Sequence, residues 1–163
     1  MPQARTRTLT LLTTLACLLA AGPGRADDDR AAARVPLHPA YKQECAACHL
    51  AYPPGMLPAA SWRRLMDNLP RHFGTDASLD AATLAQLNGW LAAHAGTYKK
   101  VVRDPSPPPQ DRITRAAWFV REHNEVRAAT WALPAVKSAA HCAACHTRAD
   151  QGEFRERDIR IPR

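Results

Sequence analysis

The pentapeptide CAACH occupies residues 45–49, and the same five residues return at 142–146. Each copy reads C-x-x-C-H, which is the attachment signature of a c-type haem. Residues three apart lie on one face of a helical turn, so the two thiols can each bond to a vinyl group of one porphyrin. The histidine that follows can then bind the iron. The expected attachment residues are Cys45, Cys48, Cys142 and Cys145. The expected proximal ligands are His49 and His146.

Other uses of paired cysteines fit this pattern less well. A zinc ribbon places roughly 15–20 residues between its cysteine pairs, whereas 93 residues separate Cys48 from Cys142. A thioredoxin-type pair needs a βαβ setting, and no strand-like run rich in Val and Ile precedes either motif. Disulfides would suit an exported protein but would not explain a histidine at the same place in both copies. The sequence therefore predicts two covalently attached haems c, each with its iron.

The first 26 residues have the pattern of a secretory signal peptide. Arg5 and Arg7 precede an apolar run over residues 9–21, and small residues lead to Ala26. The run is shorter than the roughly 20 apolar residues that span a bilayer, so an uncleaved membrane anchor is the weaker alternative. Cleavage after Ala26 would remove Cys17 and three arginines, which lowers the net charge from +7 to +4. We expect export to the periplasm, where haem attachment to such proteins takes place.

The composition indicates a globular protein and excludes several classes. The 163 residues are 46% apolar and 23% charged, which is ordinary for a soluble domain. Only 6% are aromatic, and the apolar faces of two porphyrins would supply the missing core material. Four haem propionates would offset the modest positive charge, and no basic run is interleaved with aromatics. Binding to nucleic acid is therefore not expected, and after signal cleavage no segment approaches transmembrane length.

A proline-rich segment, DPSPPPQ at residues 104–110, divides the mature chain. Its composition favours an extended, semi-rigid linker. We expect an N-terminal haem lobe at 36–103 and a C-terminal haem lobe at 111–163, each with one motif. Apolar residues recur at helical spacing on both sides of the linker. The predicted fold is mostly α, a small two-lobed multihaem c-type cytochrome with one covalent haem per lobe.

Three residues carry helix-start signals, namely Ser61, Asp80 and Ser138. The helix after Ser61 is expected to end at Pro70, because proline lacks the amide donor that a helix interior requires. The helix after Asp80 would bury one leucine face: Leu84, Leu87 and Leu91. The helix after Ser138 would carry the second motif. A further helical face past the linker would combine Ala116, Phe119, Val120, His123 and Val126.

The sixth ligand of each iron separates an electron carrier from an enzyme or sensor with an open iron site. Five histidines lie outside the two motifs: His38, His72, His94, His123 and His141. His72 leaves an apolar helix and His123 shares an apolar face with Phe119, so these two are the favoured ligands. His94 continues the leucine face and stays a candidate. His38 precedes a proline and suits a loop or propionate contact, whereas His141 adjoins its own motif too closely. The methionine rivals are Met56 and Met66, of which Met66 has the spacing of a core residue.

Several longer segments carry a family resemblance. They are ECAACHLAYPP at 44–54, LPAASW at 57–62, HFGTDASL at 72–79 and EHNEV at 122–126, together with the second motif. Through them the chain resembles the small periplasmic dihaem cytochromes c, the family that partners the oxygen-binding sphaeroides haem protein. The resemblance covers nearly all of residues 36–163. It implies bis-histidine iron in both lobes, with His49 and His72 on the first haem and His146 and His123 on the second.

The expected function is electron transfer in the periplasm. The resemblance implies a membrane donor, a cytochrome b or a quinol-side protein, and a small haem-protein acceptor. Iron with two histidines lacks the methionine ligand that raises the potential, so low-potential haems are expected. The basic C-terminal residues would form a solvated tail or pair with propionates, or alternatively dock an acidic partner; they are Arg155, Arg157, Arg160 and Arg163. The alternative function is a peroxidase-like haem enzyme or a gas or redox sensor with one open iron.

Overall fold

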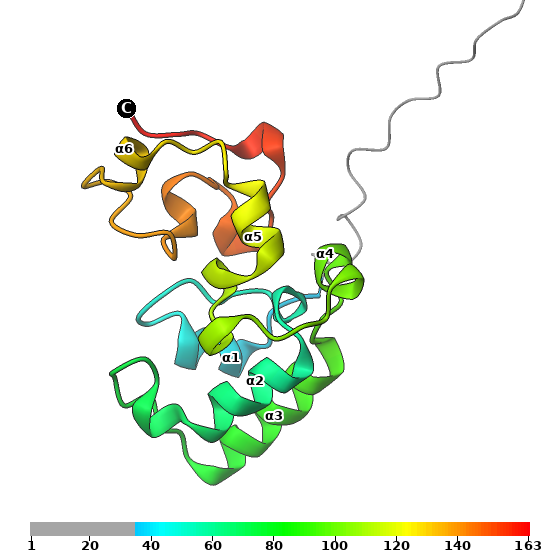
Figure 1. Ribbon diagram of the computed structural model, residues 1–163. Coiled ribbons are helices and arrows are strands. Elements are labelled where there is room, and N and C mark those ends of the chain that lie inside the picture. Colours follow the sequence, from blue (N-terminus) through cyan, green and yellow to red (C-terminus); the bar gives the residue numbers. More distant parts are fainter. Residues whose placement is uncertain (1–34) are drawn as a thin grey trace, which may run out of the picture.

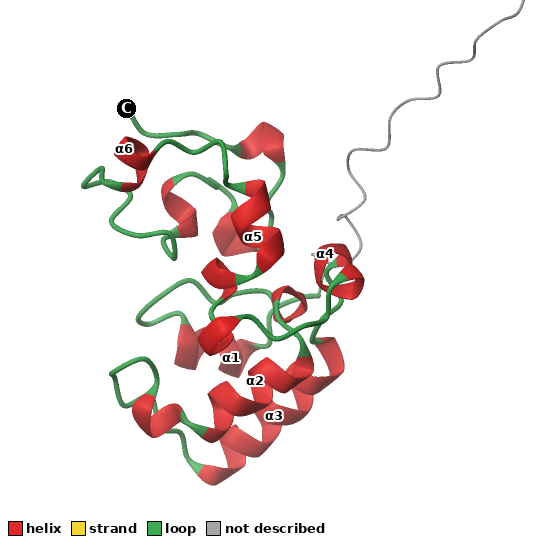
Figure 2. Cartoon of the chain, in the orientation of Figure 1, coloured by secondary structure: helices red, strands yellow, loops and turns green. Residues whose placement is uncertain are grey.

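The computed structural model describes residues 35–163, and the predicted signal peptide lies outside this range. Within the described residues the regular structure is helical, as Figures 1 and 2 show. The α-helices are α1 (Pro39–Cys45), α2 (Ala59–Asp67), α3 (Ala81–His94), α4 (Lys99–Arg103), α5 (Ala117–Glu122) and α6 (Ala128–Trp131). The 3₁₀ turns are η3 (Pro54–Met56), η4 (Leu69–Arg71), η5 (Pro109–Asp111), η6 (Ile113–Arg115), η7 (Cys142–Ala144), η8 (Ala149–Gln151) and η9 (Glu156–Asp158). The expectation of a mostly α fold is confirmed. No helix among these residues combines the length and apolarity that a membrane crossing requires.

Helix α3 forms as its sequence predicts. The Asp80 carboxylate accepts hydrogen bonds from the amides of Ala82 and Thr83, at 3.0 Å each, and so caps two of the unpaired donors at the helix start. Leu87 and Leu91 are buried on the face that packs on α1 and α2. Burying each such leucine is worth about 2 kcal/mol relative to exposure. The cap and the apolar face therefore fix this helix, the longest in the described chain.

Helix α2 differs from the prediction at its start. It begins at Ala59 after Pro58, so Ser61 lies inside the helix and is fully buried instead of capping it. Proline at the position before a helix fits because its fixed φ leads into the first turn. The helix ends at Asp67, and Pro70 lies in the 3₁₀ turn η4 that follows. The expected break before Pro70 is confirmed.

The second half of the chain has less α-helix than the spacing predicts. Helix α5 ends at Glu122, so Val126 lies beyond it, and Val120 is 58% exposed. Ser138 caps no helix, because the second motif begins with the short 3₁₀ turn η7 behind His141. The prediction of one helical face through Val126 and the prediction of a helix after Ser138 were therefore wrong. Many residues of this half lie in 3₁₀ turns that pack against one another. Tertiary contacts, and not helical propensity, therefore determine the shape of this segment.

The buried side chains form two clusters. The first joins helices α1, α2 and α3, which lie together in Figure 1, and it contains Tyr41, Trp62 and Leu87. The second contains Trp118 and Phe119 of α5 together with Met56, Tyr98 and Val101 from before the proline-rich segment. Met66 is buried in the first cluster, as its spacing predicts. Helix α4 thus packs on α5, although the proline-rich segment separates them in the sequence. Between these helices Lys100 Nζ lies 2.8 Å from Glu122 Oε2. The division of the chain at residues 104–110 stays a prediction.

Candidate haem sites

The first motif follows directly from helix α1. Pro39 occupies the first turn of the helix, and His38 Nδ1 accepts a hydrogen bond from the Ala40 amide at 3.2 Å. Cys45 ends the helix, and the turn that follows carries Cys48 and His49. The imidazole of His49 is exposed, and its Nδ1 lies 2.7 Å from the main-chain oxygen of Leu50. Since that carbonyl can only accept, Nδ1 donates and Nε2 is left to bind a metal.

His72 comes to this motif from the far end of α2. The turn η4 ends at Arg71, and His72 pairs with Thr75 across a tight loop. Phe73 in that loop has a φ of 49° and is 46% exposed. The ring centres of His72 and His49 lie 6.1 Å apart, with their planes 23° from parallel. The chain thus brings together two predicted ligands that are 23 residues apart in sequence.

The second site forms at the end of helix α5. His123 follows the helix, and its ring stacks on that of Phe119 with 4.0 Å between centres and 19° between planes. Its Nδ1 lies 2.8 Å from the Phe119 carbonyl oxygen, so Nδ1 again donates and Nε2 stays available. The stack and the hydrogen bond together fix the orientation of the ring.

His146 of the second motif faces His123. Their ring centres are 6.1 Å apart, and their planes make an angle of 70°. The ring of Phe154 also contacts that of His146, with 5.2 Å between ring centres. The C-terminal residues also cross the motif, because the Arg160 amide donates to the Cys145 carbonyl at 2.8 Å and His146 pairs with Ile159. Aromatic and backbone contacts therefore hold His146 in place.

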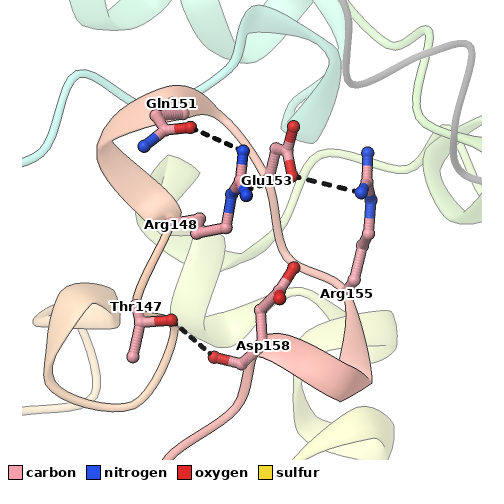
Figure 3. Close-up of polar contacts among 6 residues, drawn as sticks. All are labelled: Thr147, Arg148, Gln151, Glu153, Arg155 and Asp158. Carbon is pink, nitrogen blue, oxygen red and sulfur yellow. Dashed lines mark hydrogen bonds and ion pairs between the residues drawn. The ribbon is translucent and has the colours of Figure 1, made fainter.

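Figure 3 shows how the residues after the second motif hold one another. The hydroxyl of Thr147 donates to the Asp158 main-chain oxygen at 2.9 Å. Arg148 binds both Gln151 and Glu153, and the Glu153 carboxylate lies 3.4 Å from Arg155. One of the four basic tail residues, Arg155, is thus paired within the chain.

The electrostatics of both sites favour neutral imidazoles. Burial lowers the pKa of His72, and the neighbouring charges of His49 and Arg112 lower it further. Burial, followed by the proximity of His123, lowers the pKa of His146. Burial raises the pKa of the Cys45 and Cys142 thiols to about 11. A neutral imidazole is the form that binds a metal, and thiols of such high pKa are not activated nucleophiles or redox centres.

The spacing of the rings fits one iron between each pair of histidines. A metal–imidazole bond is about 2 Å long and the ring centre lies about 1 Å beyond the nitrogen, so two ligands on opposite sides of a metal have centres about 6 Å apart. Both pairs have this separation. A cavity of about 1530 Å³ reaches His123, Cys142, Cys145 and His146 in the second site. Small-molecule sites typically measure about 300–1,000 Å³, so there is room for a porphyrin. The residues present therefore fit two haems.

The remaining histidines make other contacts. His38 uses both ring nitrogens, one as the cap of α1 and one 3.3 Å from Gln86 Nε2. The ring of His94 contacts that of Trp90 at 5.5 Å. His141 Nδ1 lies 3.2 Å from the Val136 oxygen. The four cysteines of the described chain form no disulfide. Within residues 35–163 no three His, Cys, Asp or Glu side chains are grouped to hold a metal ion by themselves.

Sequence reasoning did not anticipate the rings that contact His49 and His72. Tyr52 stacks on His49 with 5.2 Å between ring centres. Phe73 contacts His72 at 4.8 Å, and the Arg112 guanidinium lies 4.1 Å above the Phe73 ring. Tyr52 and Phe73 both stand within three residues of a predicted ligand, and both belong to segments that carry the family resemblance. Arg112 reaches the first site from beyond the proline-rich segment, and no local pattern could have shown that.

Comparisons with known proteins agree on one family. The sequence profile of the family described as dihaem cytochrome c matches residues 41–154. The chain is similar to the crystal structure of DHC purified from Rhodobacter sphaeroides, with 43% identity over 72% of this chain and 96% of that one and a TM-score of 0.60. It is also similar to the new diheme cytochrome type c from Shewanella baltica OS155, with 37% identity over 76% and 92% of the two chains and a TM-score of 0.65.

A second structure of the Rhodobacter sphaeroides diheme cytochrome c shares 41% identity over 72% of this chain and 96% of that chain, with a TM-score of 0.65. No curated protein sequence matches the chain significantly. All residues of the two C-x-x-C-H motifs lie within the region that the family profile covers. The chain therefore belongs to the dihaem cytochrome c family, and it is a helical electron-transfer protein that carries two covalently bound haems c.

Proposed function

We propose that this protein carries electrons with two bis-histidine haems. His49 and His72 would bind the first iron, and His146 and His123 the second. Cys45 and Cys48 would attach the first haem, and Cys142 and Cys145 the second. The observation that carries the proposal is the ring-centre separation of 6.1 Å in both histidine pairs. Bound haem iron supplies one-electron redox chemistry, and ligation by two histidines favours a low potential.

The residues of the chain contribute orientation and protection to this function. Main-chain carbonyls hold the Nδ1 atoms of His49 and His123, which leaves each Nε2 directed to its metal. His72 and His146 have buried Nδ1 atoms without a hydrogen-bond partner in the described chain. Each proposed pair thus combines one hydrogen-bonded histidine with one that packing alone orients. A ligand pair that keeps its coordination in both oxidation states needs little rearrangement, which suits a carrier.

We further propose the setting of this electron transfer. The signal-like residues 1–26 support export to the periplasm. The family resemblance supports a membrane cytochrome b or quinol-side protein as donor and a small oxygen-binding haem protein as acceptor. The proposed lobes are residues 36–103 and 111–163, joined by the linker at 104–110. One haem in each lobe would let an electron enter at one lobe and leave from the other.

Spectroscopy of ligand variants tests the iron assignment. The natural holoprotein is expected to be low-spin at both haems when oxidised, and not to bind carbon monoxide when reduced. His72→Ala and His123→Ala are each expected to turn one of the two haems high-spin. His94→Ala is the matched control, because that ring contacts Trp90 and should leave both haems low-spin.

Two results would contradict the proposal. Low-spin iron at both haems in His72→Ala or His123→Ala would show that another residue is the ligand. Carbon monoxide binding to one haem of the natural reduced protein would point to the alternative, an enzyme or sensor with an open iron.

A further inference from the structure

Tyr52 contacts the surroundings of both haem motifs. Its ring stacks on the imidazole of His49, with 5.2 Å between ring centres and 21° between planes. Its hydroxyl donates a hydrogen bond of 2.8 Å to the main-chain oxygen of Ala140, which is 88 residues later in the sequence. Ala140 stands two residues before Cys142, the first cysteine of the second motif. One side chain thus joins a residue of the first motif to the segment that begins the second.

The Ala140 carbonyl oxygen is also in contact with the second attachment site. The Cys142 sulfur lies 3.7 Å from this oxygen. When Cys142 carries its haem, the sulfur has no proton to donate, but it stays the atom that links the porphyrin to the chain. The contacts therefore run from the His49 ring to the Tyr52 ring, through the Tyr52 hydroxyl to the Ala140 oxygen, and on to the Cys142 sulfur.

The first core holds Tyr52 in this position. The hydroxyl of Tyr41 donates to the Tyr52 main-chain oxygen at 2.9 Å. Tyr41 is itself only 2% exposed and packs on Trp62 and Trp90, with ring centres 6.3 Å and 5.0 Å away. This bond anchors the backbone of Tyr52, and the contacts with His49 and Ala140 then hold its side chain between the two motifs.

We propose that Tyr52 is a positioning residue for electron exchange between the two haems. It fixes the first motif relative to the second. It also closes the gap between them with its hydrogen bond to Ala140 and its ring contact with His49. The inference rests on the proposed binding of the first iron by His49. The exchange is balanced by one electron, lost at one iron and gained at the other. Tyr52 keeps its proton and its oxidation state throughout.

The physical reason is the distance dependence of electron transfer. The exchange rate falls steeply with every ångström of empty space, and much less steeply across covalent bonds and hydrogen bonds. The covalent route between the motifs follows more than 90 residues of chain, so electron transfer along it is negligible. Contacts across the gap therefore determine the electronic coupling between the two haems. Tyr52 supplies two of these contacts, a ring contact and a hydrogen bond.

Two variants of the full holoprotein separate these contributions. Tyr52→Phe keeps the stacked ring and removes the hydrogen bond to Ala140. Such a bond typically changes an equilibrium about fivefold, so we expect inter-haem exchange to slow by up to about fivefold as the gap opens more often. Tyr52→Leu removes both contacts and is expected to slow exchange by about tenfold or more. Thr97→Val is the control, because it also removes a hydroxyl that donates to a main-chain oxygen, that of His94 at 3.2 Å.

The exchange rate is measured in half-reduced protein by magnetisation transfer between the haem methyl resonances of the two oxidation states. Slower exchange in both Tyr52 variants, with Thr97→Val within about twofold of the natural rate, supports the proposal. Natural rates in Tyr52→Phe and Tyr52→Leu overturn it, as does an equal slowing in Thr97→Val. The low-spin spectrum of the natural protein tests the ligand assignment separately. An unchanged rate beside a low-spin spectrum thus contradicts only the role of Tyr52.

Discussion

The imidazole planes of His49 and His72 lie within 23° of each other, at a ring-centre separation of 6.1 Å. The corresponding planes of His123 and His146 have the same separation but cross at 70°. The stack on Phe119 and the bond to its carbonyl turn His123 away from the orientation of its partner. Two sites with the same predicted ligands therefore differ in ligand geometry.

The two haems are expected to give different electron paramagnetic resonance spectra. Parallel imidazoles donate into one iron d orbital and split it from its neighbour, whereas crossed imidazoles leave the two orbitals close in energy. We expect one rhombic low-spin signal with three resolved g values, from the first haem, and one highly anisotropic signal with a single large g value, from the second. Phe119→Leu should alter only the latter signal. Two identical rhombic signals in the natural protein would contradict the difference in geometry.

The ion pair between Arg64 and Asp111 is expected to add stability that acid removes. Arg64 Nε donates to Asp111 Oδ2 at 2.9 Å, and a second nitrogen binds the other oxygen, across 47 residues. This guanidinium holds the pKa of Asp111 below its usual value. A lowered pKa stabilises the fold above the unfolded pKa of about 4, and the gain is lost as the pH falls through the folded value.

Asp111→Asn tests this ion pair by denaturant unfolding of the holoprotein. Arg64 is half exposed, so we expect a loss of only about 0.5–1 kcal/mol at pH 7. The difference between variant and natural protein should shrink below about pH 4. Asp104→Asn neutralises a carboxylate of the same segment and serves as control. A loss that is equal at pH 7 and pH 3 would show that charge is not the cause.

The backbone at the end of the proline-rich segment is expected to be strained. Gln110 has a φ of 58° and Asp111 one of 54°, in the left-handed region. A residue with a β-carbon pays about 1 kcal/mol there, and glycine does not. Gln110→Gly should therefore raise the free energy of unfolding by up to about 1 kcal/mol, and Gln110→Val should lower it. The same change in helix α1, Gln43→Gly, should lower it by about 0.5–1 kcal/mol. A loss of stability in Gln110→Gly would contradict the strain.

The C-terminal residues are expected to stabilise the second haem site alone. The amide of Arg160 binds the Cys145 carbonyl, and Asp158 accepts from Thr147. A chain truncated after Arg155 loses these bonds, each worth about 1 kcal/mol. The unfolding midpoint should fall, and the highly anisotropic signal should broaden while the rhombic signal stays sharp. The first haem thus provides the internal control. Equal broadening of both signals would show that the tail acts on the whole fold.

Local signals were reliable where one short segment contains all the interacting groups. Asp80 and the leucines of α3 are such a case, because the cap bonds and the apolar stripe lie within one helix. Ser61 and Ser138 carried the same cap signal and failed. Pro58 starts α2 three residues before Ser61, and the segment after Ser138 follows tertiary contacts instead of a helix. Several neighbouring residues can each occupy the position that begins a helix, and the sequence alone does not decide which of them does so.

By itself the sequence determined the family, the helical class and the two covalent haems, because each attachment motif is a five-residue pattern whose chemistry is local. The tertiary structure decided what lies opposite each motif. It places His72 and His123 6.1 Å from the motif histidines, sets the two plane angles, and puts Tyr52 between the motifs. These relations join residues from 3 to 88 positions apart through packing of whole elements. Only a folded chain fixes such distances, since no local propensity encodes them.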